Sequence, residues 1–429
     1  MPETELTVED LDAVAAGDAA RWADFDLAYR RSWWIGRDAQ LSRRPSRTEL
    51  AAAACHGNGR LREAAVERLA VRADPEVLPL LLIRCVDWVR PIRDLARPLT
   101  LSKLDEPAFR AMLPLIGVLR RRQVDDWMTT LFRQALTPRL LDDALALRDN
   151  ESRRFAHHEA IGLLPAGRLL DIAAGDRDVR IRTLCGSALL DRGEAVEELL
   201  AAGTPKIRMR ALTLLGEDTA VAHLADRASA VRSMAQALVL KAGGDPAAHY
   251  RTLPVTPGVL AGLGETGTAA DAEPLERHLV DERPRFRALA VRGLRRVAPE
   301  SAAVRPLLTD PSPAVTRQVV EFLRGKLALV DVPALRALLS PEHPVHTRRA
   351  AAALLRDRDT WLRLHTDLGL LHDPDLGEDA HQDLRACRDH LTNVYTKPSA
   401  EVRADIEAIY ADLDPALARE IRLALGFST

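Results

Sequence analysis

A polar turn followed by an apolar residue, an arginine and a helix recurs along this chain, and it restricts the folds that the chain can adopt. The stretch from Val259 to Leu294 carries the pattern most clearly. It predicts a first helix from Ala269 to Leu279, a turn at residues 280–282, and a second helix from Phe286 to Leu294.

The second of these helices is amphipathic. Its apolar residues recur at i, i+3, i+4, i+7 and i+8, which places them on one helix face. They are Phe286, Leu289, Ala290, Gly293 and Leu294, and arginines occupy Arg285, Arg287, Arg292 and Arg295 around them. A single helical hairpin cannot bury such a face, so neighbouring copies must stack on both sides of it.

Further copies of the turn are present along the chain. They stand at Val89-Arg90, Val179-Arg180, Ile207-Arg208, Val231-Arg232, Phe286-Arg287, Val315 with Arg317, and Val345 with Arg348. The two longer gaps in this series are close to multiples of the shorter step, which indicates degenerate copies between them. The spacing fits an α-solenoid with units of roughly 30 residues.

The motifs of this stretch resemble the short bacterial HEAT-like repeat of the PBS-lyase type. LGETG at 263–267, PLxxxL at 274–279 and an arginine followed by alanine and leucine at helical spacing carry the resemblance. It implies an all-α fold, a right-handed α-solenoid of stacked helical hairpins that forms a single elongated superhelix.

The pattern divides the chain into three parts. Residues 1–47 form an aromatic-rich helical cap and a basic linker, 48–356 the repeat array, and 357–429 modified acidic repeats with a second cap. Trp22, Phe25, Tyr29 and Trp33 share one face of the N-terminal helix. They are interpreted as sealing the open end of the solenoid, and the alternative is a stacking platform for bases or a partner helix.

Charge is unevenly distributed although the formal net charge is only −2. Residues 28–122 hold 19 Arg and Lys against 10 Asp and Glu, whereas residues 357–429 hold 8 against 15. The acidic start of the chain does not resemble a secretion signal, and no apolar run is long enough to span a bilayer. Four cysteines without paired spacing indicate reduced thiols. These features predict a cytoplasmic protein that does not bind membranes.

Two groups of residues resemble binding motifs. Gly262, Gly264 and Gly267 satisfy G-x-G-x-x-G, but that dinucleotide motif needs a preceding strand, so we assign the glycines to the turn between helices of a repeat. A weak metal-binding candidate comprises His381, Asp383, Cys387 and His390. Its spacing matches no established zinc motif, and an acidic, solvated helix is the preferred interpretation. We therefore expect no metal and no cofactor.

The arginines that follow the polar turns have a structural interpretation. In HEAT-like repeats this arginine commonly pairs with an acidic residue of the adjacent turn, and the resemblance implies such a ladder for Arg180, Arg208, Arg232 and Arg287. The available partners are Asp176, Asp178, Asp281 and Asp310.

Two functions are compatible with this organisation. The sequence ties together no nucleophile, base and orienting group, which favours a non-catalytic scaffold that binds a protein partner through a curved helical surface. The alternative is nucleic-acid binding through the basic N-terminal third. Its candidate contacts are Arg30, Arg31, Trp33, Trp34, Arg43, Arg44, Trp88, Arg90, Arg93, Arg97, Arg120, Arg121 and Arg122.

HEAT-like DNA glycosylases provide a precedent for the second function, because they place tryptophans and an aspartate in their groove. Trp22 and Asp26 are the nearest counterparts in this chain. A chromophore or modification lyase is suggested by the repeat family alone, and no reactive cysteine or acid pair supports it.

Overall fold

The structure, a computed structural model, divides the chain into two compact units, Met1–Ala211 (unit 1) and Leu212–Thr429 (unit 2). It describes residues 7–31, 41–74, 76–122, 125–326, 329, 331–391, 396–409 and 415–425. Every regular element in these ranges is a helix, which confirms the all-α prediction.

The helices of unit 1 are short and follow one another closely. In chain order they are α1 (Val8–Ala15), α2 (Arg21–Arg31), α3 (Arg47–Cys55), α4 (Gly59–Leu69), α5 (Val77–Arg84), α6 (Arg90–Leu101), α7 (Glu106–Leu119), η1 (Arg120–Arg122), α8 (Trp127–Ala135), α9 (Leu141–Leu145), α10 (Asn150–Ala160), α11 (Ala166–Gly175), α12 (Val179–Asp191), α13 (Val196–Ala202) and α14 (Pro205–Leu215), the last of which runs across the unit boundary.

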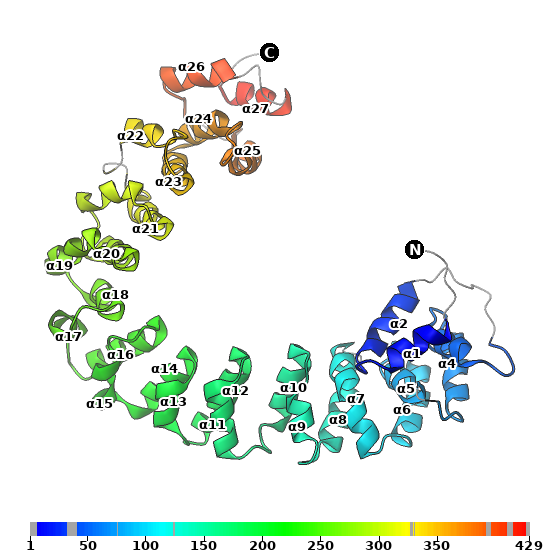
Figure 1. The fold of residues 1–429 in the computed structure, drawn as a ribbon. Coiled ribbons are helices and arrows are strands. Elements are labelled where there is room, and N and C mark those ends of the chain that lie inside the picture. The colour runs from blue at the N-terminus through cyan, green and yellow to red at the C-terminus, as the bar shows by residue number, and fades with distance from the viewer. Residues whose placement is uncertain are drawn as a thin grey trace. The chain divides into compact units, whose positions relative to one another are not determined.

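Consecutive helices of unit 1 pack against each other in pairs. The contacts join α3 to α4, α5 to α6 and α11 to α12, and α10 also packs on α7 and α12. In Figure 1, α7, α10 and α12 stand side by side along the unit. Aspartates are the N-caps of two of these helices. The Asp149 side chain accepts a hydrogen bond from the Ser152 amide, and the Asp178 side chain accepts one from the Arg180 amide, both at 2.8 Å.

Unit 2 continues the same alternation of shorter and longer helices. In chain order they are α15 (Glu217–Ala220), η2 (Val221–His223), α16 (Ser229–Lys241), α17 (Pro246–Thr252), α18 (Pro257–Thr266), η3 (Ala269–Asp271), α19 (Ala272–Glu276), η4 (Arg277–Val280), α20 (Pro284–Val297), η5 (Ala302–Thr309), α21 (Pro313–Leu323), α22 (Val332–Ala337), α23 (Val345–Arg356), α24 (Thr360–Leu370), α25 (Gly377–Leu391), α26 (Ala400–Ile409) and α27 (Pro415–Leu425).

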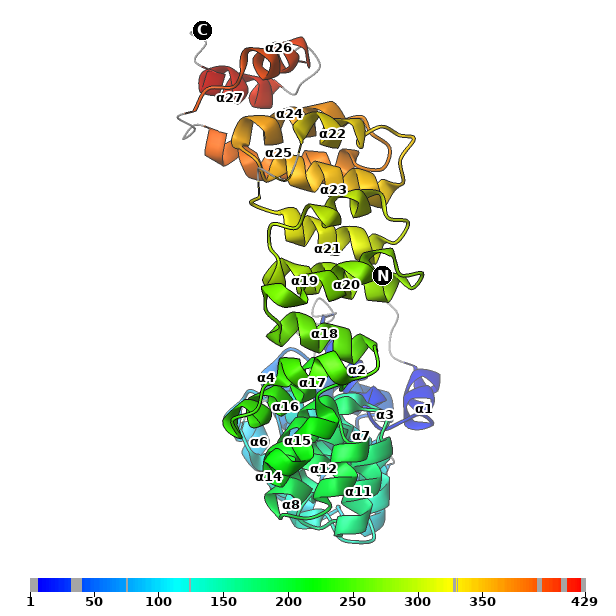
Figure 2. The ribbon, with the colours of Figure 1, turned by 90° about the vertical axis from the view of Figure 1, so that its left-hand side faces the viewer.

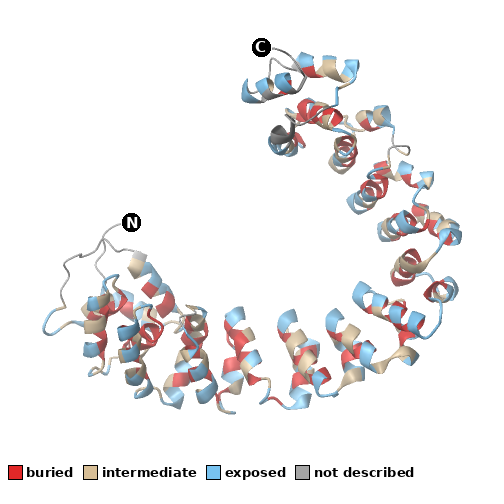
Figure 3. Cartoon of the chain, turned by 180° about the vertical axis from the view of Figure 1, so that it is seen from behind, coloured by how far each residue is buried: buried red, intermediate tan, exposed pale blue. Residues whose placement is uncertain are grey.

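The longer helices of unit 2 form a stack. α18 packs on α20, α20 on α21, and α21 on α23, and Figure 2 shows these helices in that order. Buried residues lie where helices face their neighbours, and exposed residues lie on the turns and outer faces (Figure 3). Within unit 2 the core therefore lies between stacked helices, as repeat architectures require.

The two helices predicted within residues 269–294 are present as two helical segments, and Val259–Thr266 belongs to the preceding helix, α18. Phe286, Ala290, Gly293 and Leu294 are buried in α20. The first segment differs in detail, because residues 269–280 form η3, α19 and η4 instead of one regular helix.

The glycines of the G-x-G-x-x-G match are not all in a turn, which corrects our assignment. Gly262 and Gly264 lie inside α18, and only Gly267 follows the helix as its C-cap. A Cβ atom on Gly264 would lie 2.5 Å from the Cα atom of Gly293 in α20. The motif therefore serves close helix packing, and the backbones of α18 and α20 touch because neither residue has a side chain.

Arginines connect successive repeats through carboxylates of the next turn. Each rung links a longer helix to an acidic residue 23 to 28 positions later, close to one repeat. The rungs are Arg62 to Asp87, Arg97 to Asp125, Arg154 to Asp178, Arg287 to Asp310 and Arg348 to Asp375, with N–O distances of 2.5 to 3.1 Å. We refer to these five pairs as the ladder.

Several of these arginines also bind their own turn. Arg287 donates to the backbone carbonyl of Asp281 at 2.7 Å and to that of Glu282 at 3.1 Å, while its other nitrogens hold Asp310 at 2.7 and 2.9 Å. Arg62 likewise donates to two carbonyls of its own turn at 2.9 Å. One guanidinium thus closes a turn and fixes the next repeat against it.

The four arginines that we assigned to the ladder behave differently from one another. Arg287 pairs with Asp310 as expected, and Arg232 pairs with Glu265. Arg208 donates to the Leu200 carbonyl at 2.8 Å. The Arg180 side chain forms no ion pair with any residue of the described ranges, because Arg154 of the preceding repeat holds Asp178.

We predict that Gly264→Ala destabilises the protein by about 2 kcal/mol, since the added methyl must push α18 and α20 apart. Gly369→Ala is the matched control. Gly369 lies in α24 with open space around its Cβ position, so the change should be neutral or stabilise by about 0.5 kcal/mol. Urea denaturation followed by circular dichroism measures both; equal effects of the two changes would contradict the close contact.

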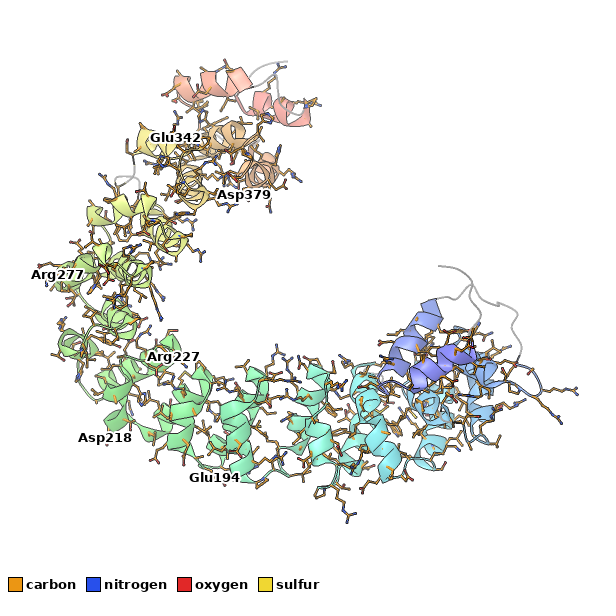
Figure 4. All side chains as sticks on the ribbon, in the orientation of Figure 1. Glu194, Asp218, Arg227, Arg277, Glu342 and Asp379 are labelled. Carbon is orange, nitrogen blue, oxygen red and sulfur yellow. The ribbon has the colours of Figure 1, made fainter. Side chains whose placement is uncertain are left out.

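We predict that Arg287→Ala costs about 3 kcal/mol, because it leaves the Asp310 carboxylate buried without its cation. Arg277→Ala is the control, because Arg277 and its partner Glu273 both have side chains that are at least 70 % exposed. Arg277 is labelled in Figure 4. Its loss should cost about 0.5 kcal/mol or less. If Arg287→Ala were as mild as the control in urea denaturation, the ladder would not hold the repeats together.

Candidate functional site

Most of the arginines proposed as nucleic-acid contacts lie in unit 1 on α2, α6 and η1. The side chain of Arg31 and the residues Trp33 and Trp34 fall outside the described part of the chain. Arg43 and Arg44 are exposed in the segment before α3.

Asp26 of α2 is fully buried and receives three guanidinium groups. Arg30 donates to it at 3.2 Å from the same helix, and Arg84 of α5 also binds its Oδ1 atom. Arg122 of η1 lies 2.8 Å from Oδ2. These contacts tie α2 to α5 and to η1, which follows α7. Asp26, suggested as a glycosylase-like aspartate, is therefore enclosed by arginines.

Asp87, in the turn before α6, is the second buried acid of this cluster. Arg62 of α4 binds it through two nitrogens at 2.8 and 2.9 Å, and Arg84 bridges it at 3.0 Å to the Asp26 side of the cluster. Burial alone would raise the pKa of Asp87, but the hydrogen bond from Arg62 and the charge of Arg84 lower it below its ordinary value. Asp87 is therefore held as an ion, and its contacts join α4 to α5.

Arg30 completes the cluster and contacts Trp88. Burial, with the neighbouring Arg84 charge, lowers the pKa of Arg30 to about 10. The guanidinium carbons of Arg30 and Arg62 lie 4.4 and 4.5 Å from the centroid of the Trp88 ring. Trp88 is 60 % exposed, yet cations already contact its ring, so it offers bases a restricted stacking surface.

Two of the three α6 arginines bind protein groups as well. Arg97 holds Asp125 through two contacts of 2.5 and 2.7 Å, and Arg93 donates to the Asp87 carbonyl at 2.6 Å. Arg90 is the exception because its side chain is 82 % exposed, with Asp94 at 3.4 Å.

The three consecutive arginines of η1 point to three different partners. Arg120 lies over the Phe155 ring at 4.2 Å, Arg121 lies 3.7 Å from Asp149, and Arg122 reaches Asp26. Much of the basic charge in this part of the chain therefore lies inside the unit or against carboxylates.

A groove opens next to Arg120, between η1, α8, α10 and α12. Its volume is about 480 Å³, and its lining mixes charged and apolar side chains. The lining residues are Arg120, Thr129, Glu151, Arg154, Phe155, His158, Glu159, Arg180, Ile181 and Leu184. Three successive repeats thus contribute to one concave surface.

A second hollow of about 510 Å³ adjoins this groove and shares Arg154 with it. Its other lining residues are Arg148, Asn150, Arg177, Asp178 and Val179, at the starts of α10 and α12. We refer to the two hollows together as the arginine groove. Of its residues, our sequence analysis named Arg120, Asp178, Val179 and Arg180, without relating them to a common surface.

The proposed metal-binding residues of α25 do not form a site in the described part of the chain. Arg363 binds Asp383 through two contacts of 2.6 Å, and His381 is exposed. The side chains of Cys387 and His390 lie outside the described residues. Elsewhere in the described ranges, no group of three or more histidine, cysteine and acidic side chains is arranged to hold a metal.

Comparisons with known proteins find resemblance at the level of solved structures. No protein-family model matches the sequence, and no curated protein matches it. Kap121p bound to Pho4p is 14 % identical at a TM-score of 0.30, and the match covers 99 % of this chain and 50 % of Kap121p. Kap121p alone gives the same identity and TM-score over 52 % of its length. The chain therefore spans about half the length of Kap121p. Within the described residues, no helix is long and apolar enough to cross a membrane.

The buried Asp367 and the partly buried Asp383 of unit 2 interact with each other, which predicts that stability depends on pH. Burial and the neighbouring Asp383 raise the pKa of Asp367 to about 7, although Arg356 donates to it at 2.7 Å. The hydrogen bond from Arg363 lowers the pKa of Asp383 to about 2. Asp367 therefore prefers to be protonated in the folded state, opposite Asp383 in its ionised form.

Because the folded pKa of Asp367 exceeds its unfolded value of 3.8, its contribution to stability is complete below pH 4 and is lost as pH rises through 7. We predict that Asp367→Asn removes this dependence and stabilises the protein by about 2 kcal/mol at pH 8 relative to the unchanged chain. Melting temperatures of both proteins from pH 5 to pH 8 provide the measurement. Parallel pH profiles would show that Asp367 is ionised throughout.

Proposed function

We propose that this chain is an array of HEAT-like repeats that acts as a scaffold and binds a protein partner in the arginine groove. In this proposal residues 48–356 are the array, and 1–47 and 357–429 are its modified ends. The observation that carries the proposal is the groove itself, in which three stacked repeats present charged and apolar side chains together.

The mixed lining of the groove supports a protein ligand. Phe155, Ile181 and Leu184 provide apolar surface beside charged groups, a combination typical of protein interfaces, which have apolar centres and polar rims. The ladder keeps consecutive repeats in register, so such a surface costs little ordering when a partner binds.

Nucleic-acid binding through the N-terminal third receives less support. Phosphate contacts need available cations, whereas Arg30, Arg97 and Arg122 are held by Asp26 or Asp125. Arg43, Arg44, Arg90 and Arg121 are the exposed candidate arginines in the described residues, and the last two lie near acids, at 3.4 Å from Asp94 and 3.7 Å from Asp149.

We predict that a photo-reactive benzoylphenylalanine at Thr129 or Leu184, both in the groove, forms a discrete covalent adduct with a partner protein in the native cells. The same probe at Leu163, a 53 % exposed residue outside the groove lining, is the control and should form none. Mass spectrometry of the adducts identifies the partner.

The identified partner, produced separately, should bind the purified chain with a Kd of about 10 µM or tighter. Leu184→Arg should weaken this binding about tenfold, while Leu163→Arg should leave it unchanged. Circular dichroism checks that both variants remain folded. Adducts of equal yield at all three positions, or a partner insensitive to Leu184→Arg, would remove the groove as the binding site.

A further inference from the structure

The charges of the arginine groove do not cancel. Glu159 faces Arg133, which donates to it at 3.1 Å, and Arg154 binds both Glu151 and Asp178. Every carboxylate that lines the groove thus already has a cation beside it.

Three arginines of the groove have no such partner. The side chains of Arg148, Arg177 and Arg180 are exposed and make no ion pair with any residue in the described ranges. A groove whose acids are neutralised and whose remaining cations face solvent is complementary to an acidic ligand.

The positions of Arg148 and Arg177 follow the repeat. Each stands directly before the aspartate that caps a longer helix, Asp149 for α10 and Asp178 for α12. They are therefore equivalent residues of neighbouring repeats. Packed helices lie roughly 10 Å apart, and an extended peptide rises about 3.3 Å per residue, so acidic residues three positions apart match this spacing.

We propose that the arginine groove binds an extended acidic segment of the partner protein, with two acidic residues three positions apart opposite Arg148 and Arg177. A third carboxylate binds Arg180, and an apolar side chain enters the groove beside Ile181 and Leu184. This inference rests on the proposed function and specifies the chemistry of the partner.

The groove favours a peptide over a nucleic acid because it offers no stacking surface for bases. Its aromatic residue, Phe155, is only 8 % exposed and lies under the Arg120 guanidinium, so bases cannot stack on it.

Fluorescence anisotropy with the full chain tests this inference. The probes are labelled 12-residue peptides with a leucine and two glutamates three positions apart, the same composition with adjacent glutamates, and the same sequence with lysines. A 12-nucleotide single-stranded DNA and a 12-base-pair duplex complete the set. At low salt we expect the first peptide to bind about threefold tighter than the second and at least tenfold tighter than the third.

The double variant Arg148→Glu, Arg177→Glu should weaken binding of the first peptide at least tenfold. The control carries the same charge change at Arg90 and Arg277, which are exposed and outside the groove, and should bind the peptide normally. Circular dichroism verifies that both variants are folded.

Three results would overturn the inference. One is equal binding of the glutamate and lysine peptides, another is peptide binding that the groove variant does not affect, and the third is DNA binding tighter than that of the acidic peptide. If photo-cross-linking at Leu184 identifies a partner that lacks an acidic segment, the scaffold function stands and the acidic ligand is rejected. If no probe binds and no adduct forms, both proposals fail.

Discussion

The bond between an arginine of one repeat and a carboxylate of the next is the interaction on which this architecture depends. Apolar burial drives helices together but is not directional, so it does not determine how far one hairpin slides along its neighbour. Arg287 fixes that position, because one planar group meets the carbonyls of its own turn and both oxygens of Asp310. Arg62 and Asp87 form the same kind of connection at the other end of the chain. The ladder turns stacked helices into a defined surface.

In the N-terminal third, buried arginine–carboxylate pairs give the sequence the charge pattern of a nucleic-acid-binding surface. Its excess of arginine resembles a surface for an anionic polymer, yet Arg62 and Arg84 are fully buried and hold Asp26 and Asp87. A count of charges along the sequence does not distinguish a cation that faces solvent from one that crosses a core. Three exposed arginines without an ion pair in the described residues, Arg148, Arg177 and Arg180, instead lie around α10 and α12, in a segment whose composition gave no indication of them.

Local patterns predicted the fold because they depend on near neighbours. The stripe from Phe286 to Leu294 determines which face of α20 is buried, and the helix starts at Pro284, a residue suited to the first helical position. The role of Gly264 could not be obtained in this way, since its reason is the Gly293 backbone in another helix. Arg180 was assigned to the ladder because Asp178 is two residues away in the sequence. In the structure, Arg154 of the preceding repeat binds that carboxylate instead. The groove was missed because it exists only between repeats.

The direction of the ladder has a consequence for how such a chain can change length. Each rung runs from a longer helix to a turn of the following repeat, so a repeat that carries a rung gives a guanidinium forward to the next one. Duplication of a segment that starts and ends at equivalent rungs, such as Arg287 and Arg348, the fourth residues of α20 and α23, would create a new joint of the same kind and leave no buried charge unpaired. Deletion of such a segment would likewise reconnect matching groups. Gain and loss of whole repeats is then tolerated more easily than the loss of one arginine within a repeat.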